Sequence, residues 1–103
     1  MRVQLTAVRL DETDITEPCH AWGEEMARRG IRVNGMGLRP PESGTTIRVR
    51  GGKALLTDGP FAETKEQIGG INILDCESLE QAVEAAKSHP WAAIGTIEVR
   101  EML

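Results

Sequence analysis

Two stretches of the chain carry apolar residues at helical spacing, and each lies between stretches in which apolar and polar residues alternate. This order restricts the chain to a fold that combines helices with a sheet. The first helix is predicted to have Thr16 as its cap and to end at Gly30, with Arg28 and Arg29 near its negative end. Its apolar stripe recurs every three or four residues and consists of Ile15, Cys19, Trp22 and Met26.

The second helix begins at a capping box that runs from Ser78 to Gln81. The Gln81 side chain is expected to reach back to the amide of the cap residue. His89-Pro90 is predicted to end this helix, with His89 capping its last carbonyl groups. The residues expected to face the core are Leu79, Ala82, Val83 and Ala86.

Four stretches are predicted to be the strands of the sheet, and the first and last of them alternate clearly between apolar and polar residues. The first covers roughly residues 2 to 10, and its second face is mixed rather than polar, so both of its faces are expected to be at least partly covered. The others are residues 31 to 38, 71 to 74 and 96 to 100.

A β-hairpin is predicted between the second and third of these strands. Residues 45 to 50 and 54 to 57 flank Gly51-Gly52, and two glycines accept the positive φ angles of a tight hairpin turn. The hairpin is expected to project from the rest of the fold.

Together these elements predict an α+β fold, a ferredoxin-like βαββαβ arrangement with an extra β-hairpin. Both helices are expected on one face of an antiparallel sheet. The predicted core consists of Leu5, Trp22, Met26, Ile73, Leu79, Val83 and Val99.

Length and charge narrow the classes of function. The chain has 103 residues and a net charge of −4, with acidic and basic residues interspersed, so we expect one domain over residues 1–103 and no nucleic-acid binding. The first ten residues are too polar for a signal peptide or a membrane span, which predicts a cytoplasmic location.

Cys19 and Cys76 are interpreted as free, buried thiols. No metal or other cofactor is expected, because the two histidines lack the spacing of metal ligands.

The segment from Asp58 to Gln67, Asp-Gly-Pro-Phe-Ala-Glu-Thr-Lys-Glu-Gln, is the most specific motif of the chain. It offers a carboxylate, an amine and an apolar side chain within one loop, as a small-molecule pocket requires. Ordinary turn chemistry at Asp58-Gly59-Pro60, with Phe61 as an apolar anchor, is the alternative interpretation. On composition alone the alternative is favoured.

This segment resembles the signature of a bacterial family, the DGPFAETKE branch of the YCII-related proteins. The resemblance covers about residues 20 to 100. It implies a dimeric α+β barrel in which two sheets pack face to face. The signature segment is then either a wall of a ligand pocket or a part of the dimer contact with Phe61 as its plug, and the packing role is favoured. The resemblance also implies a link to extracytoplasmic-function sigma factors, because genes of this branch often lie beside theirs.

The candidate site residues come from the signature segment and the first helix. Asp58 and His20 are the candidate catalytic residues, and the candidate ligand-binding residues are Phe61, Thr64 and Lys65. Glu24, one turn after His20, is placed to orient its ring, although a surface role for this histidine is favoured. Some YCII-related proteins resemble enzymes with a His–Asp pair, and either Cys19 or His20 occupies the corresponding helix position.

Three functions are consistent with these features. The first is a small-molecule enzyme of isomerase or lyase type, in which Asp58 or His20 is the base and Lys65 stabilises negative charge. The second is a non-catalytic ligand-binding or regulatory module associated with sigma factors. The third is a structural dimer domain. A pocket that holds His20 and a loop carboxylate would favour catalysis, and an apolar pocket with its acids facing solvent would favour binding.

Overall fold

The computed structural model of the protein describes residues 1–9, 13–62 and 66–103. The chain forms an α+β fold with a four-stranded sheet, three α-helices and a separate two-stranded hairpin. The elements in chain order are β1 (Arg2–Arg9), α1 (Thr16–Arg28), β2 (Arg32–Gly37), the 3₁₀ turn η1 (Pro41–Ser43), β3 (Thr45–Arg50), β4 (Lys53–Asp58), β5 (Gln67–Asp75), α2 (Leu79–Lys87), α3 (Pro90–Ile94) and β6 (Thr96–Glu101).

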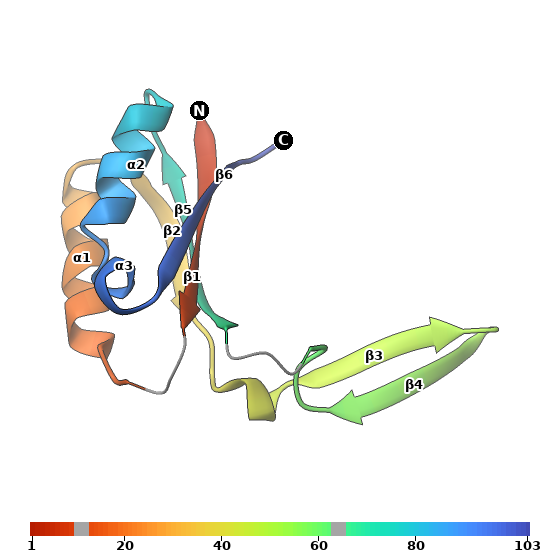
Figure 1. Ribbon diagram of the computed structural model, residues 1–103. Coiled ribbons are helices and arrows are strands. Elements are labelled where there is room, and N and C mark those ends of the chain that lie inside the picture. Colours follow the sequence, from red (N-terminus) through yellow and green to blue (C-terminus); the bar gives the residue numbers. More distant parts are fainter. Residues whose placement is uncertain (10–12, 63–65) are drawn as a thin grey trace.

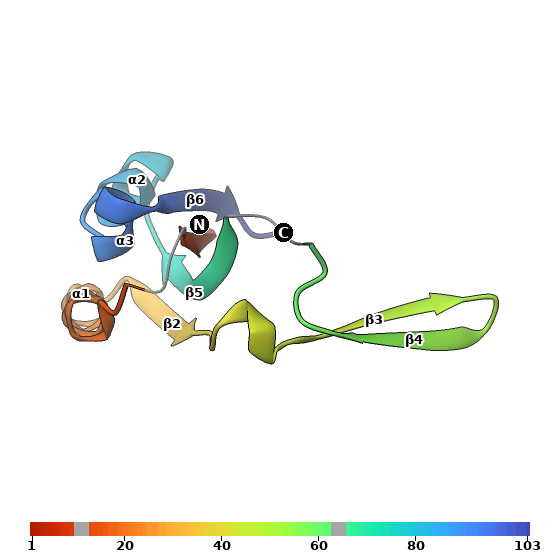
Figure 2. The same cartoon turned by 60° about the horizontal axis from the view of Figure 1, so that its bottom comes forward.

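The main sheet has the strand order β2-β5-β1-β6, and every neighbouring pair is antiparallel. This is the ferredoxin-like arrangement predicted from the order of elements. All three helices lie on the same side of the sheet (Figures 1 and 2). None of the helices in the described ranges has the length and apolarity needed to cross a membrane.

The core lies between the helices and this face of the sheet. Leu5, Trp22 and Met26 are buried there as predicted, and Val99 packs against them from β6. The remaining buried members of the cluster are Val3, Ile31, Leu74, Cys76, Ala82, Ala85 and Ala86.

Three of the predicted core positions are wrong. Ile73 pairs with Gln4 on the opposite face of the sheet, and its neighbour Leu74 is buried beside Val3 instead. On α2, Leu79 is 54% exposed and Val83 is 36% exposed. The alanines of this helix form its buried face, because their small side chains let α2 approach the sheet closely.

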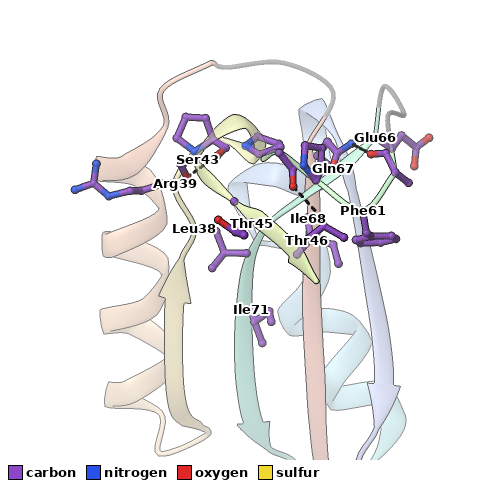
Figure 3. Close-up of a pocket in the computed structure, with 16 residues that line it drawn as sticks. Leu38, Arg39, Ser43, Thr45, Thr46, Phe61, Glu66, Gln67, Ile68 and Ile71 are labelled. Atoms are coloured by element: carbon purple, nitrogen blue, oxygen red, sulfur yellow. Dashed lines mark hydrogen bonds between the residues drawn. The ribbon is translucent and has the colours of Figure 1, made fainter. Parts of the chain in front are cut away.

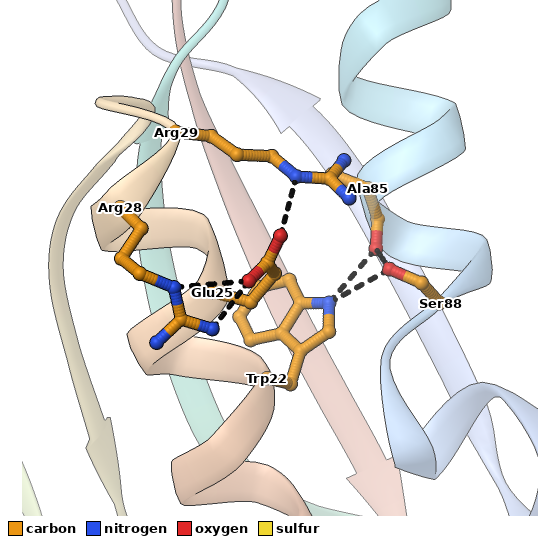
Figure 4. A network of polar contacts seen from close by, with 6 residues as sticks. All are labelled: Trp22, Glu25, Arg28, Arg29, Ala85 and Ser88. Carbon is orange, nitrogen blue, oxygen red and sulfur yellow. Dashed lines mark hydrogen bonds and ion pairs between the residues drawn. The ribbon is translucent and has the colours of Figure 1, made fainter.

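The ends of α1 differ partly from the prediction. The helix ends near Gly30, as expected. Thr16 is not its cap: the Asp14 carboxylate accepts hydrogen bonds from the Thr16 amide at 3.0 Å and the Thr16 hydroxyl at 2.7 Å. These bonds lower the pKa of Asp14 and satisfy an amide at the start of the helix. In the last turn, Arg28 and Arg29 both pair with Glu25 (Figure 4).

The capping box of α2 forms with one change from the prediction. Ser78 Oγ accepts a hydrogen bond from the Gln81 amide at 3.2 Å, while Gln81 Oε1 accepts one from the Glu77 amide at 2.7 Å, one residue before the cap.

Helix α3 was not predicted, and it changes the role of His89. The His89 Nδ1 atom accepts a hydrogen bond from the Trp91 amide at 3.0 Å, so this residue caps the start of α3 rather than the end of α2. His89 is 5% exposed, and its ring meets the Trp22 ring edge-on with centroids 4.6 Å apart. The Trp22 Nε1–H group donates to Ala85 O and Ser88 Oγ, which joins α1 to the end of α2 (Figure 4).

The β3–β4 hairpin projects from the rest of the chain, as predicted (Figures 1 and 2). Its turn has φ angles of 57° at Gly51 and 77° at Gly52, and residues that have a side chain rarely adopt such angles. The radius of gyration of 15.4 Å exceeds the roughly 13 Å expected for a compact chain of this length. The hairpin accounts for this excess.

Candidate functional site

A cavity that we call the signature pocket lies between the end of the main sheet and the segment that starts at Gly59. Its volume is about 460 Å³, within the range of small-molecule sites. Leu38, Ile68 and Ile71 form the wall on the sheet side, and Pro60 and Phe61 form the wall on the loop side (Figure 3). The pocket therefore has a mainly apolar lining.

Hydrogen bonds tie the loop wall of the signature pocket to the hairpin and to the sheet. Thr46 Oγ1 donates to Gly59 O at 2.9 Å, and the amide of Gly59 donates to Gly44 O at 2.7 Å. The side-chain amide of Gln67 donates to Ala62 O at 2.9 Å (Figure 3). The described part of the loop is thus held at both of its ends.

Phe61 lines the signature pocket but is 73% exposed. It does not act as an apolar anchor buried within its own chain, which was one interpretation of the segment. Its ring is free to contact a bound molecule or a second polypeptide.

The other candidate site residues of the signature segment are not shown to line the signature pocket. Asp58 is exposed at the end of β4 and lines neither the signature pocket nor the two smaller cavities considered below. Its side chain has no hydrogen bond or ion pair with the described residues. Thr64 and Lys65 lie outside the described residues. Glu66 is the carboxylate that reaches the signature pocket from the described part of the segment.

His20 lies on the helix side of the sheet, in a second cavity of about 260 Å³ that we call the arginine cleft. His20 and Asp58 therefore share no described cavity. Besides His20, the polar groups of this cleft come from Cys19, Arg32, Asn72 and His89. No carboxylate occurs among the described residues that line it. A third cavity of about 170 Å³ adjoins it at Cys19 and His20 and is lined also by Arg9 and Asp14.

Arg32 is held between α1 and the sheet. A Cβ atom at Gly23 would lie 3.1 Å from Arg32 Cζ, and one at Gly35 would collide with Arg32 Nη2 and Asn72 Oδ1. The two glycines thus leave the space that the guanidinium group occupies. Arg32 Nε donates to Asn72 Oδ1 at a long 3.4 Å, and its terminal nitrogens have no acceptor within the described ranges.

His89 contributes a second donor to the arginine cleft. Burial lowers the pKa of His89 to about 4, so the ring is neutral near pH 7. Because Nδ1 accepts the Trp91 amide, the proton of the neutral ring is on Nε2. This Nε2–H group has no acceptor among the residues that the structure describes.

The thiols and metal-ligand residues of the chain form no further site in the described parts. Cys76 is buried as predicted, whereas Cys19 is only half-buried, and burial raises the pKa of both thiols. Residues 1–9, 13–62 and 66–103 contain no group of three His, Cys, Asp or Glu side chains that could hold a metal ion.

Arg32 and Asn72 were not among the site residues predicted from the sequence. Both are polar residues in predicted strands, where a polar residue is expected to face solvent. The glycines at positions 23 and 35 could have indicated a site that needs space. They come close to the Arg32 guanidinium group only in the folded chain. His89 lines this cleft because it caps the start of α3, a helix that was not predicted.

The fold and the signature pocket define a class: α+β proteins with a ferredoxin-like sheet and a small-molecule-sized pocket beside it. Residues 6–103 match the sequence profile of the YCII-related domain. The chain belongs to the YCII-related family.

A similar curated protein adds no function to this assignment. The chain is 40% identical over 67 residues to "Uncharacterized protein R00369" of Rhizobium meliloti (strain 1021). The match covers 63% of this chain and 54% of that protein, so the chain spans about half the length of the relative.

Proposed function

We propose that the protein is a ligand-binding member of the YCII-related family and that the signature pocket holds a small, partly apolar organic molecule. The observation that carries this proposal is the apolar lining from two walls, the sheet end at Ile68 and Ile71 and the loop at Phe61. Burial of apolar ligand surface at about 25 cal/mol per Å² provides the binding free energy. The proposal assigns no chemical step to the pocket.

Exposure of Phe61 supports this role. An aromatic side chain that is 73% exposed gains free energy when a ligand covers it. The carbonyl of the same residue accepts a hydrogen bond from Arg48 Nη2 at 3.3 Å, which links this wall to the hairpin. The Phe61 ring is therefore positioned at the pocket before a ligand arrives.

The proposal is tested with p-cresol and indole as probes, because each combines an apolar ring with one polar group. In protein with ¹³C-labelled isoleucine methyl groups, both probes are expected to shift the Ile68 and Ile71 resonances in a saturable way. Phe61→Ala is expected to weaken binding about fivefold or more, since it removes one apolar wall.

Leu55→Ala is the matched control. Leu55 is 52% exposed on the hairpin and does not line the pocket, so its truncation is expected to leave probe affinity unchanged. The proposal is overturned if neither probe shifts the two isoleucines, or if Phe61→Ala and the wild-type protein bind both probes equally.

Proton-transfer catalysis of isomerase or lyase type is a second candidate function. The observation in its favour is that His20, a candidate base, shares the arginine cleft with the cation of Arg32. His20 and Asp58 share no described cavity, which weighs against the pair predicted from the resemblance. Ligand binding is preferred because the signature pocket has a mainly apolar lining and its acid, Glu66, is exposed. Asp14, the loop carboxylate that shares a smaller cavity with His20, accepts hydrogen bonds from Thr16 instead. Such a binding role also suits a regulatory module linked to a sigma factor.

We also propose that the working form is a homodimer. The face of the main sheet opposite the helices carries Met36, Ile71 and Ile73, and no described element covers it. One face of the hairpin is apolar too, with Ile47 paired to Leu56. A two-stranded hairpin is marginally stable by itself, so a second copy that covers both surfaces would stabilise it.

A further inference from the structure

The arginine cleft combines three features that together specify the chemistry of a ligand. It contains a cation, it contains hydrogen-bond donors without acceptors, and its described lining contains no acid. The absence of acids is notable in a chain with 16 acidic and 12 basic residues. These features lie on the helix side of the sheet, and the cleft shares no lining residue with the signature pocket.

We propose that the arginine cleft binds the carboxylate group of a small organic acid, with Arg32 as its principal contact. The planar guanidinium group presents parallel N–H donors that match the two oxygens of a carboxylate. Both terminal nitrogens, Nη1 and Nη2, lack an acceptor among the described residues. The cleft volume of about 260 Å³ limits the ligand to a small molecule.

The orientation of Arg32 is set before a ligand binds. The backbone at Gly23 and Gly35 leaves room for the guanidinium group, and the Asn72 side-chain oxygen accepts from Nε at 3.4 Å. With that oxygen facing Arg32, the Asn72 NH₂ group remains a donor. A guanidinium group that is already oriented loses less conformational entropy on binding than a flexible surface arginine.

The charge of the cleft favours a carboxylate over a phosphate. His89 is neutral near pH 7, so it contributes its Nε2–H donor without a second full positive charge. Arg32 is the cation among the described residues that line the cleft, and Arg9 lies beside the cleft over the Trp91 ring. One lining cation matches a monoanion better than the dianionic form of phosphate. His20, exposed at the cleft, is positioned to contact the remainder of the acid.

The test uses sodium propionate, sodium benzoate and inorganic phosphate as probes at constant ionic strength. In ¹⁵N-labelled protein, the two carboxylates are expected to shift the Arg32 Nε–H resonance with saturation, and phosphate is expected to bind at least fivefold more weakly. Tighter binding of phosphate than of either carboxylate overturns the assignment, as does the absence of a saturable shift with both carboxylates.

Asn72→Asp is the decisive variant, because it places a carboxylate beside Arg32 with almost no change of shape. It is expected to lower the affinity for both carboxylates at least tenfold while the protein stays folded. Arg50→Gln, on the hairpin, removes one positive charge away from the cleft and is expected to leave the affinity unchanged. If Asn72→Asp binds as tightly as the wild-type protein, or if Arg50→Gln weakens binding equally, the proposal is wrong.

Arg32→Lys provides an independent variant should Asn72→Asp not fold. It keeps the charge but loses the paired donors, so a loss of about tenfold or more is expected, and unchanged affinity overturns the proposal. The p-cresol and indole probes of the signature pocket report on Ile68 and Ile71 instead. Failure of one site is therefore distinguishable from failure of the other.

Discussion

At the scale of single residues, His89 connects local structure with the arginine cleft. Its Nδ1 atom caps α3, its ring contacts Trp22, and its remaining N–H group reaches the cleft. One side chain can serve these three roles only while it is neutral, because protonation of Nδ1 would remove the acceptor for the Trp91 amide.

This gives a prediction for the dependence of stability on pH. The pKa of His89 is lowered from 6.5 to about 4 in the folded protein, so the unfolded chain binds more protons between these values. The contribution of neutral His89 is complete above pH 6.5 and is lost as the pH falls toward 4, by on the order of 3 kcal/mol. Urea denaturation between pH 4 and pH 7 measures it.

His89→Asn is the control for this prediction. Asparagine is a good cap whose side-chain oxygen accepts the same amide, and it does not titrate. The free energy of unfolding of this variant is expected to vary less between pH 6.5 and 4 than that of the wild-type protein. Equal pH dependence in both proteins would contradict the role assigned to His89.

At the scale of secondary-structure elements, the start of α2 is defined by side chains close in sequence. Ser78 Oγ accepts the amide of Gln81, and the Gln81 side chain accepts the amide of Glu77, so two donors near the start of the helix are satisfied. Helix α2 has only nine residues, and its start is therefore a large part of the element.

Ser78→Ala is predicted to lower the free energy of unfolding by about 1 kcal/mol, because the Gln81 amide loses its acceptor. Ser78→Asn keeps an acceptor at this position and is expected to stay within about 0.5 kcal/mol of the wild-type protein. Urea denaturation near pH 7 compares the three proteins, and equal stability of the alanine and asparagine variants would show that the cap contributes nothing.

At the scale of the whole molecule, the hairpin is the element least supported by its own chain. Its alternation places Ile47, Val49 and Leu56 on one face, with exposures of 63%, 59% and 67%. The opposite face contains Arg48, Leu55 and Lys53. An apolar hairpin face of this kind is more stable when covered by another polypeptide.

The proposed homodimer leads to a prediction about this apolar face. The double substitution Ile47→Lys and Leu56→Lys is expected to convert a dimer at micromolar concentration into a monomer, because it places two charges where apolar burial is required. Sedimentation velocity gives the molecular mass of each protein.

Leu55→Lys is the matched control, since it adds a charge to the same hairpin on the opposite face. This variant is expected to remain a dimer. A monomeric wild-type protein would contradict the homodimer, and dissociation of Leu55→Lys to the same extent would show that the apolar face is not the contact.

The sequence by itself determined the order of the strands and of the helices α1 and α2, the hairpin turn at Gly51-Gly52 and the capping box at Ser78. The turn and the capping box depend on contacts between residues close in the chain. It also indicated the family through the segment from Asp58 to Gln67. The wall of the signature pocket formed by Phe61 was predicted as a ligand contact, and the pocket makes that role geometrically possible.

Only the tertiary structure decided which face each ambiguous residue occupies. The run Ile71-Asn72-Ile73-Leu74 is almost continuously apolar, so its burial depends on the pairing of Leu74 with Val3 rather than on local spacing. Helix α3 has five residues, too few for a helical period to appear in the sequence. The arginine cleft is likewise a product of folding, because the glycines, the guanidinium group and the histidine that define it come from α1, β2 and the start of α3, and long-range packing alone brings them together.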